Sequence, residues 1–93
     1  MKLRYTQKAI AELDGILADI EARSPQGALR VQARIQAITK LLLQFPKSGQ
    51  LTAIPALRRL VATPYPYLIF YQHEIDEIVV VSVRHAARRR SGP

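Results

Sequence analysis

The stretch from Leu57 to His85 constrains the fold most strongly, because it combines the highest apolar density with the highest content of β-branched residues. It divides into three short segments that are rich in Val, Ile, Tyr and Phe and are separated by turn-forming residues, which is typical of strands: 57–62, 67–72 and 77–84. The last segment is apolar at almost every position, which indicates a central strand covered on both faces. We therefore expect an antiparallel meander at the centre of the protein.

Two helices are predicted before this meander. At 7–23 and at 25–44, apolar residues recur every three or four positions, as they do on the buried face of a helix. Between them, Ser24 offers a capping hydroxyl and Pro25 suits the first turn of a helix. The Gly, Ser and Pro residues of 46–55 then predict a surface loop that leads into the meander.

These elements predict one α+β domain over residues 1–93, with a further strand at 2–5 and a basic tail at 85–93. The order β-α-α-β-β-β predicts a helical hairpin packed on one face of a mostly antiparallel four-stranded sheet. In the segment 67–72, both alternating sets of side chains are apolar. A face that the helices leave uncovered would therefore be an exposed apolar patch, and we interpret it as a surface that binds a partner.

Composition narrows the possible functions. The chain has no cysteine, and its two histidines lack metal-ligand spacing, so we expect neither a disulfide nor a metal site. No apolar run reaches the roughly 18 residues of a membrane span and the N-terminus has no export-signal pattern, so we expect a cytoplasmic protein with no membrane partner. Basic and acidic residues balance in 1–24, so the whole net charge of +7 falls in 25–93 and should face something acidic.

Ordinary hydrolase chemistry is not indicated, because the sequence has no nucleophile–base pair, glycine-rich phosphate loop or carboxylate pair. We expect no catalytic residue and no cofactor. A basic set near the meander is the remaining candidate for a site: Arg58, Arg59, Arg84, His85, Arg88, Arg89 and Arg90. All of them except Arg84 also have a structural explanation, namely solvation of an edge strand for Arg58 and Arg59, a capping or core role for His85 and a flexible tail for the last three.

Three stretches, in order and over nearly the whole chain, resemble the ParE/RelE superfamily of bacterial toxin–antitoxin toxins. They are Pro55-Ala56-Leu57-Arg58, Tyr67-Leu68-Ile69-Phe70-Tyr71 and Val83-Arg84-His85-Ala86-Ala87-Arg88, the last of which looks like the family's strand-terminal His-x-x-Arg. The resemblance implies a small toxin held inactive by a cognate antitoxin that wraps its sheet and helices. The residues that we expect to bind this antitoxin are those of the two-sided apolar strand: Leu68, Phe70, Tyr67 and Tyr71.

The resemblance implies one of two activities. The RelE-like branch cleaves messenger RNA on the ribosome, whereas the ParE-like branch inhibits DNA gyrase. RNA-cleaving members usually carry Tyr-Arg-x-x-Tyr on the tyrosine-rich strand, and Leu68 stands where that arginine would bind a phosphate. The lysines before the second strand are missing apart from Lys47, and no tyrosine follows His85. The resemblance therefore favours the ParE-like branch, with DNA gyrase as the target.

On this interpretation, the expected target-binding residues are Arg58, His85, Arg88, Arg89 and Arg90. Two alternatives stay open. In a RelE-like messenger RNA endoribonuclease, the catalytic residues would be Arg58, Arg59 and His85. A nucleic-acid-binding module could instead use the positive charge directly. Direct nucleic-acid binding is the weaker alternative, because the basic residues are not interleaved with stacking aromatics and no helix carries a dense arginine row.

Overall fold

The structure is a computed structural model and describes residues 1–87 of the chain. Its elements, in chain order, are β1 (Lys2–Tyr5), α1 (Gln7–Glu21), α2 (Pro25–Gln44), β2 (Gln50–Leu51), β3 (Leu57–Val61), β4 (Tyr67–His73) and β5 (Glu77–His85). The strands form one sheet in the order β1-β5-β4-β3-β2, in which only the β1–β5 pair is parallel. The predicted α+β fold, a helical hairpin on a mostly antiparallel sheet, is confirmed.

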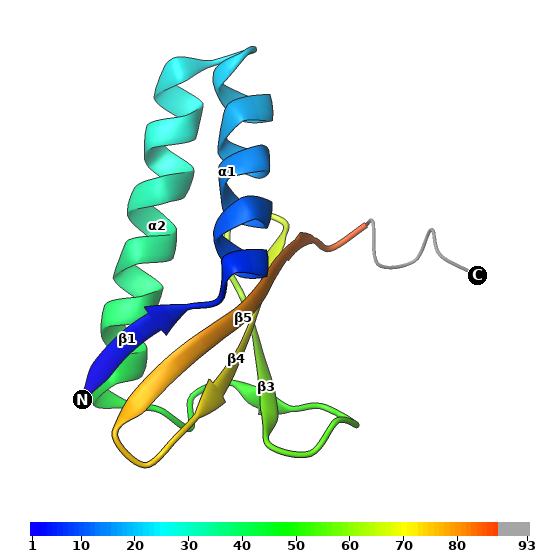
Figure 1. The fold of residues 1–93 in the computed structure, drawn as a ribbon. Helices are drawn as coiled ribbons and strands as arrows, with labels where there is room; N and C mark the ends of the chain where they lie inside the picture. The colour runs from blue at the N-terminus through cyan, green and yellow to red at the C-terminus, as the bar shows by residue number, and fades with distance from the viewer. Residues whose placement is uncertain (88–93) are drawn as a thin grey trace.

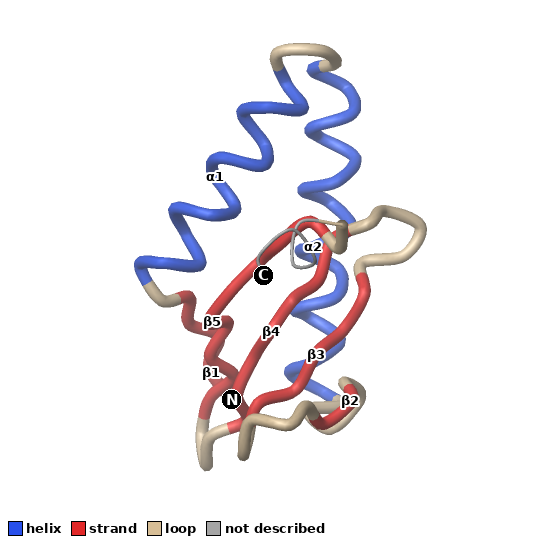
Figure 2. Tube along the Cα trace, turned by 90° about the vertical axis from the view of Figure 1, so that its right-hand side faces the viewer, coloured by secondary structure: helices blue, strands red, loops and turns tan. Residues whose placement is uncertain are grey.

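The helical hairpin covers one face of this sheet (Figure 1). Helix α2 passes behind the strands, while α1 lies beside the β5 edge and projects with α2 beyond the sheet (Figure 2). Side-chain caps fix both helix starts, because Thr6 Oγ1 accepts from the Ala9 amide at 3.1 Å and Ser24 Oγ accepts from the Gly27 amide at 3.0 Å. Within residues 1–87, no helix is long and apolar enough to cross a membrane.

The main core lies between α2 and the sheet. Helix α2 buries one stripe of side chains at helical spacing: Ala28, Val31, Ile35, Ile38 and Leu42. Facing them are alternate residues of the two central strands: Tyr67, Ile69 and Tyr71 from β4, with Ile78, Val80 and Val83 from β5. Helix α1 contacts both α2 and β5, but it buries only Ala9 completely, and Leu13, Ile16, Leu17 and Ile20 are partly buried against the core.

The sheet has one strand more than the four expected. Strand β2 falls inside the predicted loop 46–55, where two residues are too few to show an alternating pattern. Helix α1 ends at Glu21 rather than at residue 23, because the amides of Arg23 and Ser24 both donate to the Ile20 carbonyl and tighten the final turn. Strand β3 ends one residue earlier than expected, and β4 and β5 each extend one residue further.

Candidate functional site on the open face of the sheet

The register of β3, β4 and β5 divides their side chains between two faces. Residues that pair across antiparallel strands point to the same side of a sheet. Arg59 pairs with Phe70, and Phe70 pairs with Ser82, whereas the next residue, Tyr71, is buried in the core. The side of the sheet opposite α2 is turned toward the viewer in Figure 2, and we call it the open face. It carries Arg59, Phe70, Ser82 and Arg84.

A bulge keeps Ser82 and Arg84 on this face. The β4–β5 register shifts between Phe70 and Tyr71, so that Val81 is the extra residue on β5. A bulge of this kind reverses the alternation of the strand beyond it. Without the shift, Ser82 would point into the core.

Arg84 lies over the Phe70 ring on the open face. Its guanidinium carbon is 5.2 Å from the centre of the Phe70 ring, and its Nε donates to Ser82 Oγ at 3.0 Å. A cation over an aromatic face contributes about 0.5–1 kcal/mol at an exposed site. The Ser82 hydrogen bond uses only Nε, and within residues 1–87 no other side-chain hydrogen bond of the Arg84 guanidinium is present.

Glu12 of helix α1 anchors the other side of Ser82. Its Oε1 accepts from Ser82 Oγ at 2.8 Å and from the Val83 amide at 3.0 Å, and its Oε2 pairs with Lys8 Nζ at 3.1 Å. Strand β1 pairs with β5 only as far as Val80, so this carboxylate satisfies an edge amide that the sheet leaves free. Burial raises the pKa of Glu12, but the hydrogen bonds from Ser82, Val83 and Lys8 outweigh it and lower the pKa.

Lys8, Glu12, Ser82 and Arg84 therefore form one polar chain from helix α1 to the open face. Lys8 Nζ also reaches Ser82 Oγ, at 3.2 Å. Glu12 was not among the candidate site residues expected from the sequence. The Lys8–Glu12 spacing of four residues was the only local signal, and it indicates no contact with a strand.

Arg58 points to the opposite side from Arg59. It pairs with Tyr71, and its Nη1 donates to the carbonyls of Gly49 at 2.8 Å and Lys47 at 3.4 Å. Tyr71 Oη donates to the Pro46 carbonyl and accepts from the Gly49 amide, both at 2.8 Å. Arg58 and Tyr71 thus fasten the loop that leads from α2 to β2, which gives Arg58 a structural role.

His85 also contacts its own surroundings. Its ring meets that of Tyr67 edge to face, with 5.4 Å between centroids, and its Nδ1 accepts from the Ala87 amide at 3.1 Å. Arg58 pairs with Tyr71 and His85 with Tyr67, four residues apart along β4, which is about 13 Å along the strand direction. The structure therefore does not bring Arg58 and His85 together.

Comparison with known proteins identifies the family. A family model described as "ParE toxin of type II toxin-antitoxin system, parDE" matches residues 3–90. The chain belongs to the ParE toxin family. The resemblance found in the sequence is therefore confirmed, and membership implies a cognate antitoxin as partner.

Two relatives of this ParE-family protein are also named as toxins, and a solved structure has the same fold. "Putative toxin Y4kP" of Sinorhizobium fredii is 38% identical over 85 residues, which cover 91% of this chain and 88% of the relative. "Toxin RelE2" of Caulobacter vibrioides is 37% identical over 84 residues, covering 90% and 93%. A solved structure of the "Chromosomal ParDE TA system from P. aeruginosa" superposes with a TM-score of 0.81 at 26% identity, covering 91% of this chain and 95% of that one.

The four residues expected to bind the antitoxin do not form one accessible surface. In the ParE-family toxin, Tyr71 is completely buried and Tyr67 is 9% exposed, because both rings pack in the core between sheet and helices. Leu68 is 4% exposed, and Phe70 is half-buried beneath Arg84. We therefore drop Tyr67 and Tyr71 from the expected antitoxin surface. Of the expected target-binding residues, Arg88, Arg89 and Arg90 lie outside the described part of the chain.

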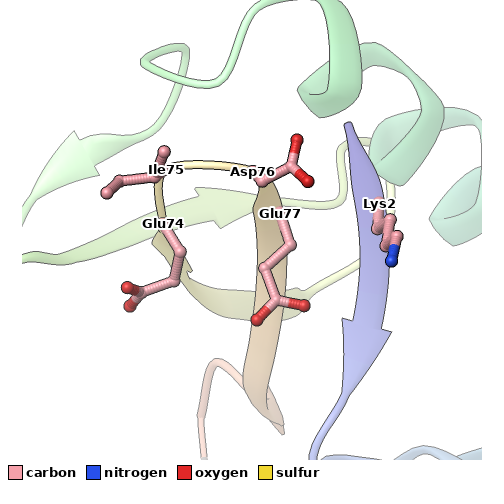
Figure 3. Close-up of a pocket in the computed structure, with 5 residues that line it drawn as sticks. All are labelled: Lys2, Glu74, Ile75, Asp76 and Glu77. Atoms are coloured by element: carbon pink, nitrogen blue, oxygen red, sulfur yellow. The ribbon is translucent and has the colours of Figure 1, made fainter.

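The β4–β5 turn forms a second polar region, at the far end of the sheet. Lys2, Glu74, Ile75, Asp76 and Glu77 line a pocket there (Figure 3). The acidic side chains of Glu74 and Asp76 point in different directions in this view, and Glu77 pairs with Arg4 at 3.2 Å. Residues 1–87 contain no group of three or more His, Asp or Glu side chains that could hold a metal ion.

Proposed function

We propose that this ParE-family toxin inhibits DNA gyrase in the cytoplasm and that its cognate antitoxin neutralises it. The observation that carries the proposal is the match of a ParE toxin model over residues 3–90. Leu68 supports it, because a leucine stands where RNA-cleaving members of the superfamily usually carry an arginine.

The geometry also favours binding over catalysis. General acid–base catalysis needs a base within hydrogen-bond reach of the proton that it removes. His85 Nδ1 is occupied by a backbone amide, and Arg58 is bound to backbone carbonyls about 13 Å away along the strand. Glu12, the carboxylate connected to Arg84 through Ser82, accepts from several donors and has a lowered pKa, so it is a poor proton acceptor.

A ribosome-dependent messenger RNA endoribonuclease is the second candidate. One relative at 37% identity is named "Toxin RelE2", and Arg59 and Arg84 on the open face could bind RNA phosphates. In such an enzyme, Arg59 would have to act without Arg58 and His85, which point to the other side of the sheet.

For the antitoxin, we propose a segment that covers the apolar part of the open face around Phe70 and Val61. Val61 pairs with Leu68 on this face and is 49% exposed, so it offers apolar surface to a partner. An antitoxin seated there would lie next to Arg59 and Arg84, so acidic residues in it would complement the face. Neutralisation would then result from direct occlusion.

The test is a gyrase supercoiling assay with purified toxin and relaxed plasmid. We expect inhibition that rises with toxin concentration and is reversed by one equivalent of antitoxin, while a type I topoisomerase on the same plasmid is unaffected. Gyrase would be refuted as the target if the toxin arrests growth in cells but an excess of the folded toxin does not reduce supercoiling in this assay.

A further inference from the structure

We propose that the open face is the surface with which this toxin docks on an acidic protein target, with Arg59 and Arg84 as its anchoring cations and Ser82 and Glu12 as the residues that position Arg84. The inference rests on the proposed function and deepens it, because it names the surface and the chemistry of the partner. It replaces Arg58 and His85, which contact the protein's own backbone, as the target-binding residues.

Arg59 and Arg84 are the two arginines that the strand register places on the open face of β3 and β5. The acidic residues of the chain lie on helix α1, in the β4–β5 turn or at the first position of β5. Arg4, near that turn, is neutralised by Glu77, with which it shares two hydrogen bonds. Within residues 1–87, neither Arg59 nor Arg84 forms a salt bridge. The open face thus presents two guanidinium groups without a direct carboxylate partner, since Arg84 is linked to Glu12 only through Ser82.

Both guanidinium groups are already held in place. Arg84 is fixed by Phe70 and Ser82, and Arg59 reaches across to the Gln50 side-chain oxygen of β2 at 3.4 Å. Their partners are neutral, so the charge of each arginine is available to a carboxylate, which guanidinium binds in a bidentate manner. Side chains that are ordered before binding lose less conformational entropy on binding, which favours affinity.

The surroundings fit an acidic protein surface better than a nucleic acid. Phe70 is half-buried and its ring carries Arg84, so it offers no free platform for stacking a base. Two arginines neutralise few phosphates, whereas arginine is enriched among the hot-spot residues of protein–protein interfaces. Val61, which is 49% exposed, adds apolar surface on the same face.

The experiment compares charge reversals on and off this face. Arg59→Glu and Arg84→Glu change the open face, and Arg30→Glu makes the same change at an exposed position of α2 as a matched control. Each variant is checked by thermal melting and then measured for gyrase binding and for growth arrest. We expect a loss of affinity of about 10- to 100-fold for each open-face variant. The control should change affinity less than about twofold.

The positioning role is tested by Ser82→Ala, which keeps every charge on the open face. We expect weaker gyrase binding with the salt dependence of the wild type, because Arg84 is present but no longer held by the hydroxyl. Ser82→Thr, which restores a hydroxyl, should recover most of the affinity. If both open-face reversals fold and still bind gyrase and arrest growth like the wild type, the inference is wrong. If either reversal fails to fold, Arg59→Gln and Arg84→Gln replace them, and gyrase binding and growth arrest like those of the wild type again show that the inference is wrong.

Failure of the proposed function gives a different pattern. If the wild type arrests growth but does not bind gyrase, gyrase is not the target. Loss of growth arrest in the Arg59→Glu and Arg84→Glu variants, but not in Arg30→Glu, would still support the open face as the docking surface. Tight binding of the wild type to a single-stranded RNA probe, lost in the same two variants, would overturn an acidic protein as the partner.

Discussion

At the residue scale, the carboxylate of Glu12 joins helix α1 to the free edge of β5. Because its pKa is lowered in the folded protein, the unfolded chain binds a proton more readily, and the ionised carboxylate stabilises the fold. This contribution is complete above the ordinary value of about 4.5 and is lost as the pH falls through the lower folded pKa. We predict that Glu12→Ala lowers the free energy of unfolding by about 1–3 kcal/mol at neutral pH.

Denaturant unfolding at neutral and acidic pH measures this effect. The difference between wild type and Glu12→Ala should shrink below about pH 4.5. Asp14→Ala removes an exposed carboxylate of the same helix and serves as control. The role given to Glu12 would be contradicted if Glu12→Ala lowers the free energy of unfolding no more than the control does, or if its effect does not depend on pH.

Tyr71 offers a second test at the same scale. Tyr71→Phe removes the hydroxyl that bonds both the Pro46 carbonyl and the Gly49 amide in a buried setting. Leaving buried groups unpaired costs about 1–3 kcal/mol, so thermal melting should show a clear loss of stability. Tyr65→Phe is the control, because Tyr65 is half-buried and its hydroxyl forms no hydrogen bond within residues 1–87. Equal melting temperatures for the two variants would show that the Tyr71 hydroxyl contributes nothing.

At the scale of elements, Arg58 and Arg59 are neighbours in sequence with opposite roles. Arg58→Ala should free the loop between α2 and β2 and lower stability by about 1–2 kcal/mol, because the carbonyls of Gly49 and Lys47 lose their donor. Arg59→Ala should change stability by less than about 0.5 kcal/mol, as is usual at surfaces, but should weaken target inhibition. Chemical denaturation and the supercoiling assay separate the two outcomes. The reverse assignment, in which Arg58→Ala folds normally but does not inhibit, would restore Arg58 to the target surface.

The same contrast shows what the sequence could predict about the elements. Apolar periodicity and the Ser24 cap were enough for the helices, and β-branched density was enough for the three long strands. Alternation along 67–72 showed that Leu68 and Phe70 point to one face and Tyr67 and Tyr71 to the other. It did not show which of the two faces the helices cover. That choice, the two-residue strand β2 and the contact of Glu12 with β5 all depend on tertiary packing. The candidate site was therefore predictable only as a set of basic residues near the meander.

At the scale of the whole molecule, we expect the toxin to be stabilised by its antitoxin. Helix α1 projects beyond the sheet with only Ala9 fully buried, and Val61, Leu51 and Ile54 are each at least 49% exposed. A ligand that binds only the folded state at 100 times its dissociation constant stabilises it by about 2.7 kcal/mol, so the melting temperature should rise by several degrees. Thermal melting of the toxin with and without its cognate antitoxin tests this. A toxin that stays monomeric at high concentration and melts at the same temperature in both cases would contradict it.

The activity of the whole toxin can be measured most directly in cells in which its expression is induced without antitoxin. Gyrase trapped on cleaved DNA and the 5′ ends of messenger RNA are quantified in the same culture, with an Arg59→Glu/Arg84→Glu double variant alongside. We predict that gyrase–DNA cleavage complexes and the SOS response increase for the wild type and not for the variant, and that no new codon-positioned messenger RNA ends arise. Messenger RNA cut at defined codon positions, with gyrase complexes unchanged, would show that the toxin is a ribosome-dependent endoribonuclease and not a gyrase inhibitor.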